Sequence, residues 1–342
     1  MDFAQVLAQL TALPGPSGTE GPVAERAAVL LAPFVDRVET DRLGNLVGYR
    51  SCRRTHARTL MLDAHLDEVG FMVSGYHEGY LRFRTLGGVD PRILPGLELQ
   101  LLTVPPRTAV VACLPPHVQD KEDADKAIPL EDLLLDAGLS PGAARAEIPI
   151  GTRAVFKGDV VPLGAKQLSG HAFDDRACFA VLLRVMELLK DQPLTVDLAV
   201  CGSVQEELGA RGARTAAFAL EPDACIVVDV THGHTPDAPR HKTFALGGGP
   251  CVGMGPGCHR QMSSQLIGMA KAHGIPCQIE VMEGNTGTNA WPIQVSRRGV
   301  AAAMVSLPLK YMHTPVETVH LDDMENTAQL IARYVMSLEG EV

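Results

Sequence analysis

Apolar residues recur with helical spacing at residues 2–12 and 22–34, and a turn-rich PGPSGTEG segment separates these two predicted helices. Short β-branched runs between residues 37 and 64 predict strands. Beyond residue 160, apolar runs such as LTVDLAVCGSV and DACIVVDV alternate with helical stretches such as CFAVLLRVMELLK. Strands that alternate with helices predict an α/β fold, with an open, mostly parallel sheet and helices on both of its faces.

The stretch between residues 70 and 160 has a different pattern. Its apolar runs are short and are separated by glycine and proline, as in FMVSGY, LRFRTLGG, LELQLLT and AVVACLPP. Such a pattern is typical of a small β-barrel or sandwich. We therefore predict an α/β domain formed by residues 1–69 and 161–342, with a β-rich, barrel-like domain at residues 70–160 inserted into it.

Composition narrows the possible functions. The chain has 342 residues, which is enough for two domains. Its formal net charge is -10, so it lacks the positive surface charge that binds nucleic acids and anionic membranes. The N-terminal MDFAQVLAQL carries an acid where a signal peptide has basic residues, and no apolar run approaches the ~20 residues of a bilayer span. We expect a cytoplasmic protein without nucleic-acid or membrane partners.

The eight cysteines contain no CxxC pair. Cys251 and Cys258, the latter next to His259, could bind a metal. Neither their spacing nor a second pair supports a thiolate site, so we interpret the cysteines as reduced and mostly buried thiols.

Acidic and histidine side chains follow several of the predicted strands. Ligands of open α/β sheets bind beyond the carboxyl ends of the strands. In MLDAHLDEVG, His65 follows an apolar strand and Asp67 lies two residues further on. A metal-bound imidazole usually donates its other N–H to a carboxylate, and the His-x-Asp spacing allows this locally. Taken alone, the pair also fits an ordinary surface turn.

Two pairs of adjacent acids follow. HAFDDRACF places Asp174 and Asp175 at a helix start, where the acids could cap the helix and pair with Arg176, or where one carboxylate could bridge two cations. SVQEELGARG places Glu206 and Glu207 directly after a strand. Neighbouring side chains diverge there, so one could ligate a metal while the other faces substrate. Alternatively, the two acids could simply occupy the N-terminal turn of the following helix.

Two more candidates complete the set. VVDVTHG places Asp229 at the end of a buried strand, where a lone carboxylate is costly unless it is paired or ligates a metal, and LKYMHTPVE places His313 just past the last strand. Oxygen and nitrogen ligands suit zinc, cobalt or manganese. One bridging acid and two terminal ligands per ion would make a two-metal site. Asp174 is then the best candidate bridge, and Asp175 supports the site or is purely structural.

In their order along the chain, HLDEVGFMV, FDDR, QEELGARGA, VVDVTHG and YMHTPVE resemble motifs of the di-metal aminopeptidases that form tetrahedral particles. This is the TET-type, glutamyl-aminopeptidase-like family, some members of which carry an endoglucanase label. LGGVDPRILPG and GTNAWPIQVSRRGV extend the resemblance over nearly the whole chain. The resemblance implies an enzyme that removes the N-terminal residue from peptides with a free N-terminus. It also implies that residues 70–160 serve dimerisation and that the chain self-associates into a homo-oligomer, a dodecamer.

The resemblance implies two divalent metal ions per subunit, zinc, cobalt or manganese. His65 and Asp229 would hold one ion, Glu207 and His313 would hold the other, and Asp174 would bridge them. The two ions together would activate the water molecule that attacks the peptide bond.

Two further residues would act in catalysis according to the same resemblance. Glu206 would be the general base, and Asp67 would orient His65. The sequence departs from the family pattern at Asn289 in GTNAWPIQ, where many relatives carry aspartate. Because this residue is not a ligand in the pattern, we expect the departure to affect substrate contacts and not the metal pair.

Two alternative functions remain at this level. A glycoside hydrolase of endoglucanase type needs two carboxylates about 5–10 Å apart and no metal, and Glu206 with an aspartate could supply them. An aromatic content of only 4% and two histidines without a role argue against it. An inactive metal-stabilised scaffold would need the ligands but not the base, which is present as Glu206.

Overall fold

The structure is a computed structural model that describes residues 1–118 and 126–340. The strands of its sheet are β1 (Arg37–Thr40), β2 (Leu46–Arg50), β3 (Thr59–His65), β10 (Val161–Leu163), β11 (Gln167–Gly170), β12 (Asp197–Ser203), β13 (Ala224–His232), β14 (Cys251–Met254), β15 (Gln278–Val281), β16 (Ala301–Lys310) and β17 (Glu317–His320). The strands of its barrel are β4 (Gly70–His77), β5 (Tyr80–Leu86), β6 (Glu98–Leu101), β7 (Arg107–Val111), β8 (Leu134–Asp136) and β9 (Arg153–Phe156). The α-helices are α1 (Phe3–Thr11), α2 (Gly21–Leu31), α3 (Pro141–Glu147), α4 (Phe173–Leu189), α5 (Arg211–Leu220), α6 (Arg260–His273), α7 (Ala290–Gln294) and α8 (Leu321–Ser337).

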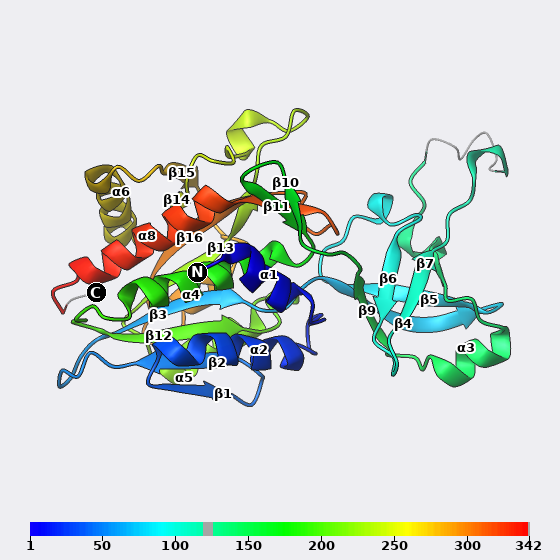
Figure 1. The fold of residues 1–342 in the computed structure, drawn as a ribbon, viewed down its shortest axis with the longest axis horizontal. Coiled ribbons are helices and arrows are strands. Elements are labelled where there is room, and N and C mark those ends of the chain that lie inside the picture. The colour runs from blue at the N-terminus through cyan, green and yellow to red at the C-terminus, as the bar shows by residue number, and fades with distance from the viewer. Residues whose placement is uncertain (119–125, 341–342) are drawn as a thin grey trace.

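The described residues form an 11-stranded sheet in the order β1-β2-β12-β3-β13-β16-β17-β11-β10, with β14 and β15 attached to β16 (Figure 1). The central strands β12, β3, β13 and β16 pair in parallel, as does β14 with β15. The outer strands β1, β2, β17, β11 and β10 pair antiparallel. The α/β fold predicted from the sequence is confirmed, and its parallel character lies in the centre of a mixed sheet. This centre brings the carboxyl ends of four strands to one edge.

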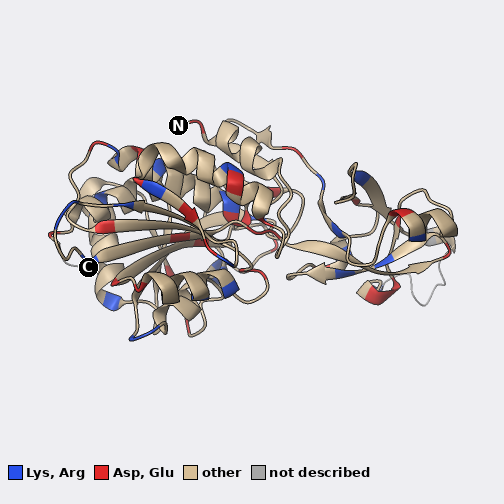
Figure 2. Cartoon of the chain, turned by 90° about the horizontal axis from the view of Figure 1, so that it is seen from below, with Lys and Arg blue, Asp and Glu red and all other residues tan. Residues whose placement is uncertain are grey.

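Alternating side chains attach helices to both faces of the sheet, as predicted. Leu60 and Leu62 of β3 belong to a core shared with α1, α2, α4, α6 and α8, whereas Met61 belongs to a core shared with α5 and α7. This is the two-residue period of a strand that is covered on both sides. The two layers of helices enclose the sheet in Figure 2. Helix α4 is buried along most of its length, which holds its first turn rigidly against the carboxyl edge.

The barrel lies at one end of the molecule and has a hydrophobic core of its own (Figure 1). Its strands close in the order β4-β5-β8-β7-β6-β9, which confirms the barrel-like insert. The Phe71 ring meets Phe83 and Phe156 edge to face, with centroids 5.7 and 5.2 Å apart. Among the described residues from 70 to 156, no polar or charged side chain is buried. Apolar burial therefore stabilises this core without internal charges.

Two observations complete the fold. Helix α3 was not predicted, although Ser140 caps it through the Ala143 N–H and Pro141 occupies its first turn, which are ordinary signals of a helix start.

Across the described ranges, no helix combines the length and the apolar character that a membrane span requires.

Candidate metal centre

The predicted site residues lie together at the carboxyl edge of the sheet. His65 ends β3, Asp174 lies in the first turn of α4, and Asp229 lies in β13. Glu206 and Glu207 follow β12, and His313 follows β16. These side chains line one pocket of about 250 Å³ with Val230, Thr231, His232, Glu280, Thr286, Gly287, Thr288 and Met312. Residues up to 248 positions apart in the chain thus meet because parallel strands end at the same edge.

Asp174 lies between the two histidines. Its Oδ1 is 3.1 Å from His65 Nε2, and its Oδ2 is 3.2 Å from His313 Nε2. Glu207 Oε1 is 3.0 Å from the same His313 nitrogen. Each oxygen of one carboxylate therefore faces a different imidazole, which is the position that a residue shared by two cations would need.

Three groups of side chains have ligand atoms within 4.8 Å of one another and could hold a metal ion. The groups are His65 with Glu206 and Glu207, His65 with Asp175 and Asp229, and Asp174 with Glu207 and His313. Within the described ranges, none of these groups contains a cysteine, which agrees with the interpretation of Cys251 and Cys258 as buried thiols. The structure therefore favours the oxygen and nitrogen ligand set that the sequence indicates.

The electrostatics of the site fit a cation. Burial raises the pKa of Asp229 and of Glu207. Burial lowers the pKa of His313, but its contacts with Asp174 and Glu207 outweigh that effect and raise the pKa to about 11. The acids thus favour the positively charged form of His313, and they would favour a bound metal cation for the same reason. Asp175 Oδ1 is buried without a hydrogen-bond partner, and divalent cations would compensate charges of this kind.

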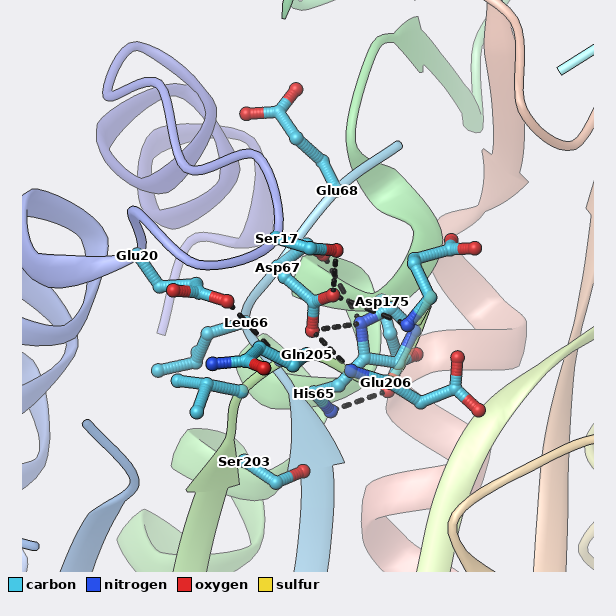
Figure 3. Close-up of polar contacts among 12 residues, drawn as sticks. Ser17, Glu20, His65, Leu66, Asp67, Glu68, Asp175, Ser203, Gln205 and Glu206 are labelled. Atoms are coloured by element: carbon cyan, nitrogen blue, oxygen red, sulfur yellow. Dashed lines mark hydrogen bonds and ion pairs between the residues drawn. The ribbon is translucent and has the colours of Figure 1, made fainter. Parts of the chain in front are cut away.

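Asp67 connects His65 with the turn that carries the two glutamates (Figure 3). Its carboxylate accepts hydrogen bonds from Ser17 Oγ at 2.6 Å, from the Glu206 N–H at 2.9 Å and from the Glu207 N–H at 3.2 Å. His65 Nδ1 lies 3.1 Å from the Asp67 carbonyl oxygen and 3.5 Å from its carboxylate. The closer contact of the imidazole is therefore to the backbone of Asp67, while the carboxylate fixes the turn.

Glu206 is the acid in the pocket whose side chain no hydrogen bond holds among the described residues. Burial raises the pKa of its carboxyl to about 8, and the charges of Glu207, Asp67 and Asp174 act in the same direction while that of His65 opposes them. A carboxyl that faces a pocket and titrates near neutral pH has the properties of a general base.

Sequence reasoning gave Glu317 no role, yet it supports two candidate ligands. The buried Glu317 carboxylate accepts hydrogen bonds from the backbone N–H groups of Asp174 at 3.1 Å, His313 at 2.8 Å and Phe173 at 2.7 Å. It therefore joins the start of α4 to the loop after β16. The sequence showed a glutamate next to YMHTP, but nothing local indicated its burial.

Arg176 does not pair with the adjacent acids, which was one alternative for this motif. It is fully buried and donates to Glu68 Oε1 at 2.8 Å and to carbonyl oxygens of Leu10, Leu13 and Leu66. This arginine ties α1, the loop after β3 and α4 together behind the site. Arg176 therefore does not occupy the carboxylates of Asp174 and Asp175.

The loop after the second barrel strand also reaches the site. The carbonyl oxygen of Gly88 contacts His313 Nδ1, which orients the imidazole with Nε2 toward Asp174 and Glu207. Gly87 has φ of 86°, and a Cβ there would lie 2.9 Å from Val69 and 3.2 Å from Glu207. Glycine is required at this close approach of the barrel to the pocket.

Asn289 was expected to alter substrate contacts, but the structure places it away from the pocket. Only 1% of it is exposed, and its Nδ2 donates to Asp63 Oδ2 and to Ser203 Oγ, both at 2.8 Å. Its side chain does not line the pocket. Asn289 instead attaches the loop that contains Thr286–Thr288 to strands β3 and β12.

The carboxyl edge of this α/β sheet gathers acids and imidazoles around a pocket, an arrangement suited to a metal-dependent hydrolase. A family model described as M42 glutamyl aminopeptidase matches residues 44–330. The lysyl aminopeptidase of Pyrococcus furiosus is 32% identical over 332 residues, which cover 95% of this chain and 94% of that protein.

Solved structures agree with this family. An aminopeptidase from the archaeon Desulfurococcus kamchatkensis is similar at a TM-score of 0.91 and 32% identity, over 99% of this chain and 95% of that one. The Pyrococcus horikoshii TET1 peptidase, which can assemble into a tetrahedron or a large octahedral shell, is similar at a TM-score of 0.85 and 30% identity, over 98% and 100% of the chains. The chain therefore belongs to the M42 glutamyl aminopeptidase family and is a peptide hydrolase, as the sequence predicts.

Proposed function

We propose that this chain is an aminopeptidase that holds two divalent ions in the pocket at the carboxyl edge. His65 and Asp229 would hold one ion, Glu207 and His313 the other, with Asp174 between them. The proposal depends above all on Asp174, whose two oxygens face different imidazoles at 3.1 and 3.2 Å. Zinc, cobalt or manganese suits this set of oxygen and nitrogen ligands.

When bound, such ions lower the pKa of a water molecule toward ~7 and polarise the scissile carbonyl group. Glu206 takes a proton from the attacking water and passes it to the leaving amine. Its backbone is held by the Asp67 carboxylate, so its side chain projects into the pocket from a fixed turn. A neighbouring cation lowers the pKa of a carboxyl, and this would keep Glu206 in the ionised form that a base requires.

Removal of a single N-terminal residue follows from the charge of the pocket. A free α-amino group is positively charged and can bind beside one of its acids, while an internal peptide N–H cannot form such an ion pair. The small pocket, about 250 Å³, also suits one side chain better than an extended peptide. The aminopeptidase names of the relatives support this mode of cleavage.

The two alternative functions have less support. A glycoside hydrolase would leave the contacts of His65 and His313 with Asp174 without a purpose, since its chemistry needs carboxylates alone. A metal-stabilised scaffold would not need Glu206, whose carboxyl lies in the pocket with a pKa raised by burial to about 8.

We also propose the domain roles that the resemblance implies. Residues 1–69 and 161–342 would form the catalytic domain, and residues 70–160 would form a dimerisation domain. Self-association into a dodecamer in the cytoplasm would follow. The assembly described for the P. horikoshii TET1 peptidase supports a homo-oligomer, and light scattering of the purified protein would measure its mass.

Aminoacyl-p-nitroanilides test the reaction directly. We expect the purified protein to hydrolyse them, to lose this activity after treatment with a chelator, and to regain it with zinc, cobalt or manganese. A peptide blocked by N-acetylation should not be cleaved. Hydrolysis of cellulose that survives the chelator would instead favour the glycoside hydrolase, and retention of full peptidase activity without metal would contradict the proposed centre.

A further inference from the structure

The pocket contains one acid that the proposed mechanism does not use. Glu280 of β15 lines the pocket together with the candidate metal ligands. Its Oε1 accepts a hydrogen bond from Thr231 Oγ1 and its Oε2 accepts one from Ser306 Oγ, both at 2.6 Å. Thr231 and Ser306 are buried side chains of the neighbouring strands β13 and β16. The carboxylate of Glu280 is therefore held in one orientation.

The charge of Glu280 remains uncompensated within the described part of the chain. Its two hydrogen-bond donors are neutral hydroxyls, and it forms no ion pair with a lysine or arginine there. Each carboxylate oxygen has two lone pairs, so each keeps acceptor capacity after one hydroxyl bond. A half-buried, oriented and unpaired carboxylate in a pocket is suited to bind a cation.

The sheet register places this carboxylate close to the candidate metal ligands. Ser306 of β16 lies opposite Asp229 of β13, and Thr231 lies two residues further along the same face. Two residues of a strand span about 7 Å, so Glu280 is roughly one long side chain away from the ligand Asp229. A residue whose peptide bond is held at the metal centre could therefore extend its side chain to Glu280.

We propose that Glu280 binds the positively charged side chain of an N-terminal lysine or arginine, which makes this enzyme selective for basic N-terminal residues. The inference rests on the proposed function, because it takes the scissile bond to lie at the metal centre. Thr286–Thr288 and Met312 line the same pocket and would contact the aliphatic stem. An N-terminal glutamate would place a second carboxylate against Glu280 and would be rejected, in spite of the family's glutamyl name.

The test compares kcat/KM of the metal-loaded protein and of its Glu280→Gln variant for lysyl-, arginyl-, leucyl- and glutamyl-p-nitroanilide. We expect the wild-type protein to prefer the two basic substrates and to cleave the glutamyl substrate most slowly. Glutamine keeps the shape, accepts one hydroxyl bond through its carbonyl oxygen and donates through its amide N–H to the other hydroxyl oxygen, but it lacks the charge. Loss of a charged hydrogen bond should lower kcat/KM for the basic substrates about 10- to 100-fold, with little change for the leucyl substrate.

Glu283→Gln is the matched control, because Glu283 is an exposed acid two residues beyond the same strand and outside the pocket. It should leave the preference unchanged. An equal loss on all four substrates in Glu280→Gln would overturn the inference, since it would assign Glu280 to the α-amino group that they share. A wild-type preference for the leucyl or glutamyl substrate would also overturn it, while the proposed aminopeptidase function would stand.

If no substrate is cleaved, the proposed function fails, and binding then decides the inference separately. Calorimetry with L-lysinamide and L-leucinamide needs no turnover. Preferential binding of L-lysinamide that is lost in Glu280→Gln would support the role of Glu280. Equal affinity for the two amides would overturn it.

Discussion

The barrel and the carboxyl edge of the sheet bury different kinds of side chain. The described barrel residues bury only apolar side chains, around Phe71 and the two rings that it contacts. The edge buries Asp174, Asp175 and Asp229 within a few ångströms of His65. Burial of apolar surface stabilises a fold, whereas burial of acids costs free energy unless cations compensate them. The comparison shows that unfavourable burial marks the functional region.

The two regions nevertheless meet at the loop that follows the second barrel strand. Gly88 follows the second barrel strand and contacts His313 through its carbonyl oxygen. A region stabilised by apolar packing thus orients a side chain in the region that carries charge. Variants that affect one region and not the other test how far the two are independent.

The largest expected effect is a loss of turnover from a change in the charged region at the carboxyl edge. Glu206→Gln removes the proton acceptor but keeps the size of the side chain, so kcat should fall by about 10²- to 10⁴-fold while the bound metal content is unchanged. Turnover of leucyl-p-nitroanilide and elemental analysis of the purified variant measure the two quantities. Glu25→Gln, an exposed change on α2, is the control. Full activity of Glu206→Gln would contradict the assignment of the base.

The next effect concerns the barrel. Phe71→Ala leaves a cavity in its core and should lower the free energy of unfolding by about 3–5 kcal/mol, measured by chemical denaturation. Val110→Ala on β7, where the side chain is 40% exposed, should cost much less. Metal affinity should not change if the regions are independent. A parallel loss of metal affinity in Phe71→Ala would mean that the barrel core positions His313 through Gly88.

The smallest expected effect is on stability, from a change at the contact of Asn289 with Asp63 behind the site. Burial raises the pKa of Asp63 to about 6, and hydrogen bonds from Cys201, Asn289 and Ser203 oppose this rise. Asn289→Asp would place two carboxylates together, and the folded state would have to keep a proton that the unfolded chain releases near pH 4. The variant should be less stable at pH 7 by about 1–3 kcal/mol.

The pH dependence of this variant has a definite sign. Because the folded pair has a raised pKa, the loss of stability should be small near pH 4 and should grow as the pH rises toward 7. Denaturation of wild type, Asn289→Asp and the exposed control Asn285→Asp across this range measures it. A loss that is independent of pH would show that the two carboxylates do not share a proton.

Local patterns in the sequence predicted a large part of the fold and of the candidate site. The change from alternating helices and strands to short Gly- and Pro-separated runs separated the sheet from the barrel. His65, Asp174, Glu206, Glu207, Asp229 and His313 were identified because each follows or precedes an apolar element, and the structure places all of them in one pocket. Their roles as ligands and base remain predictions.

Residues that act through distant partners were not found in this way. Glu317 was given no role, the contacts of Arg176 with Glu68 and with distant carbonyl oxygens were not foreseen, and Asn289 was expected to affect substrate contacts although it contacts Asp63, 226 positions away. Glu280 lies in a strand, QIEV, that the sequence predicts, but nothing in that stretch indicates that Thr231 and Ser306 lie beside the glutamate. The sequence close to each of these residues contains no pattern that indicates its distant contact.

By itself, the sequence determined which segments form helices and strands and which polar side chains stand at their ends, because both depend on the periodicity of neighbouring residues. Only the tertiary structure decided which of those side chains meet, which carboxylates are buried and which remain without a counter-charge. The physical reason is that hydrogen bonds and Coulomb interactions depend on distance in space, and that distance is set by strand order and not by separation along the chain.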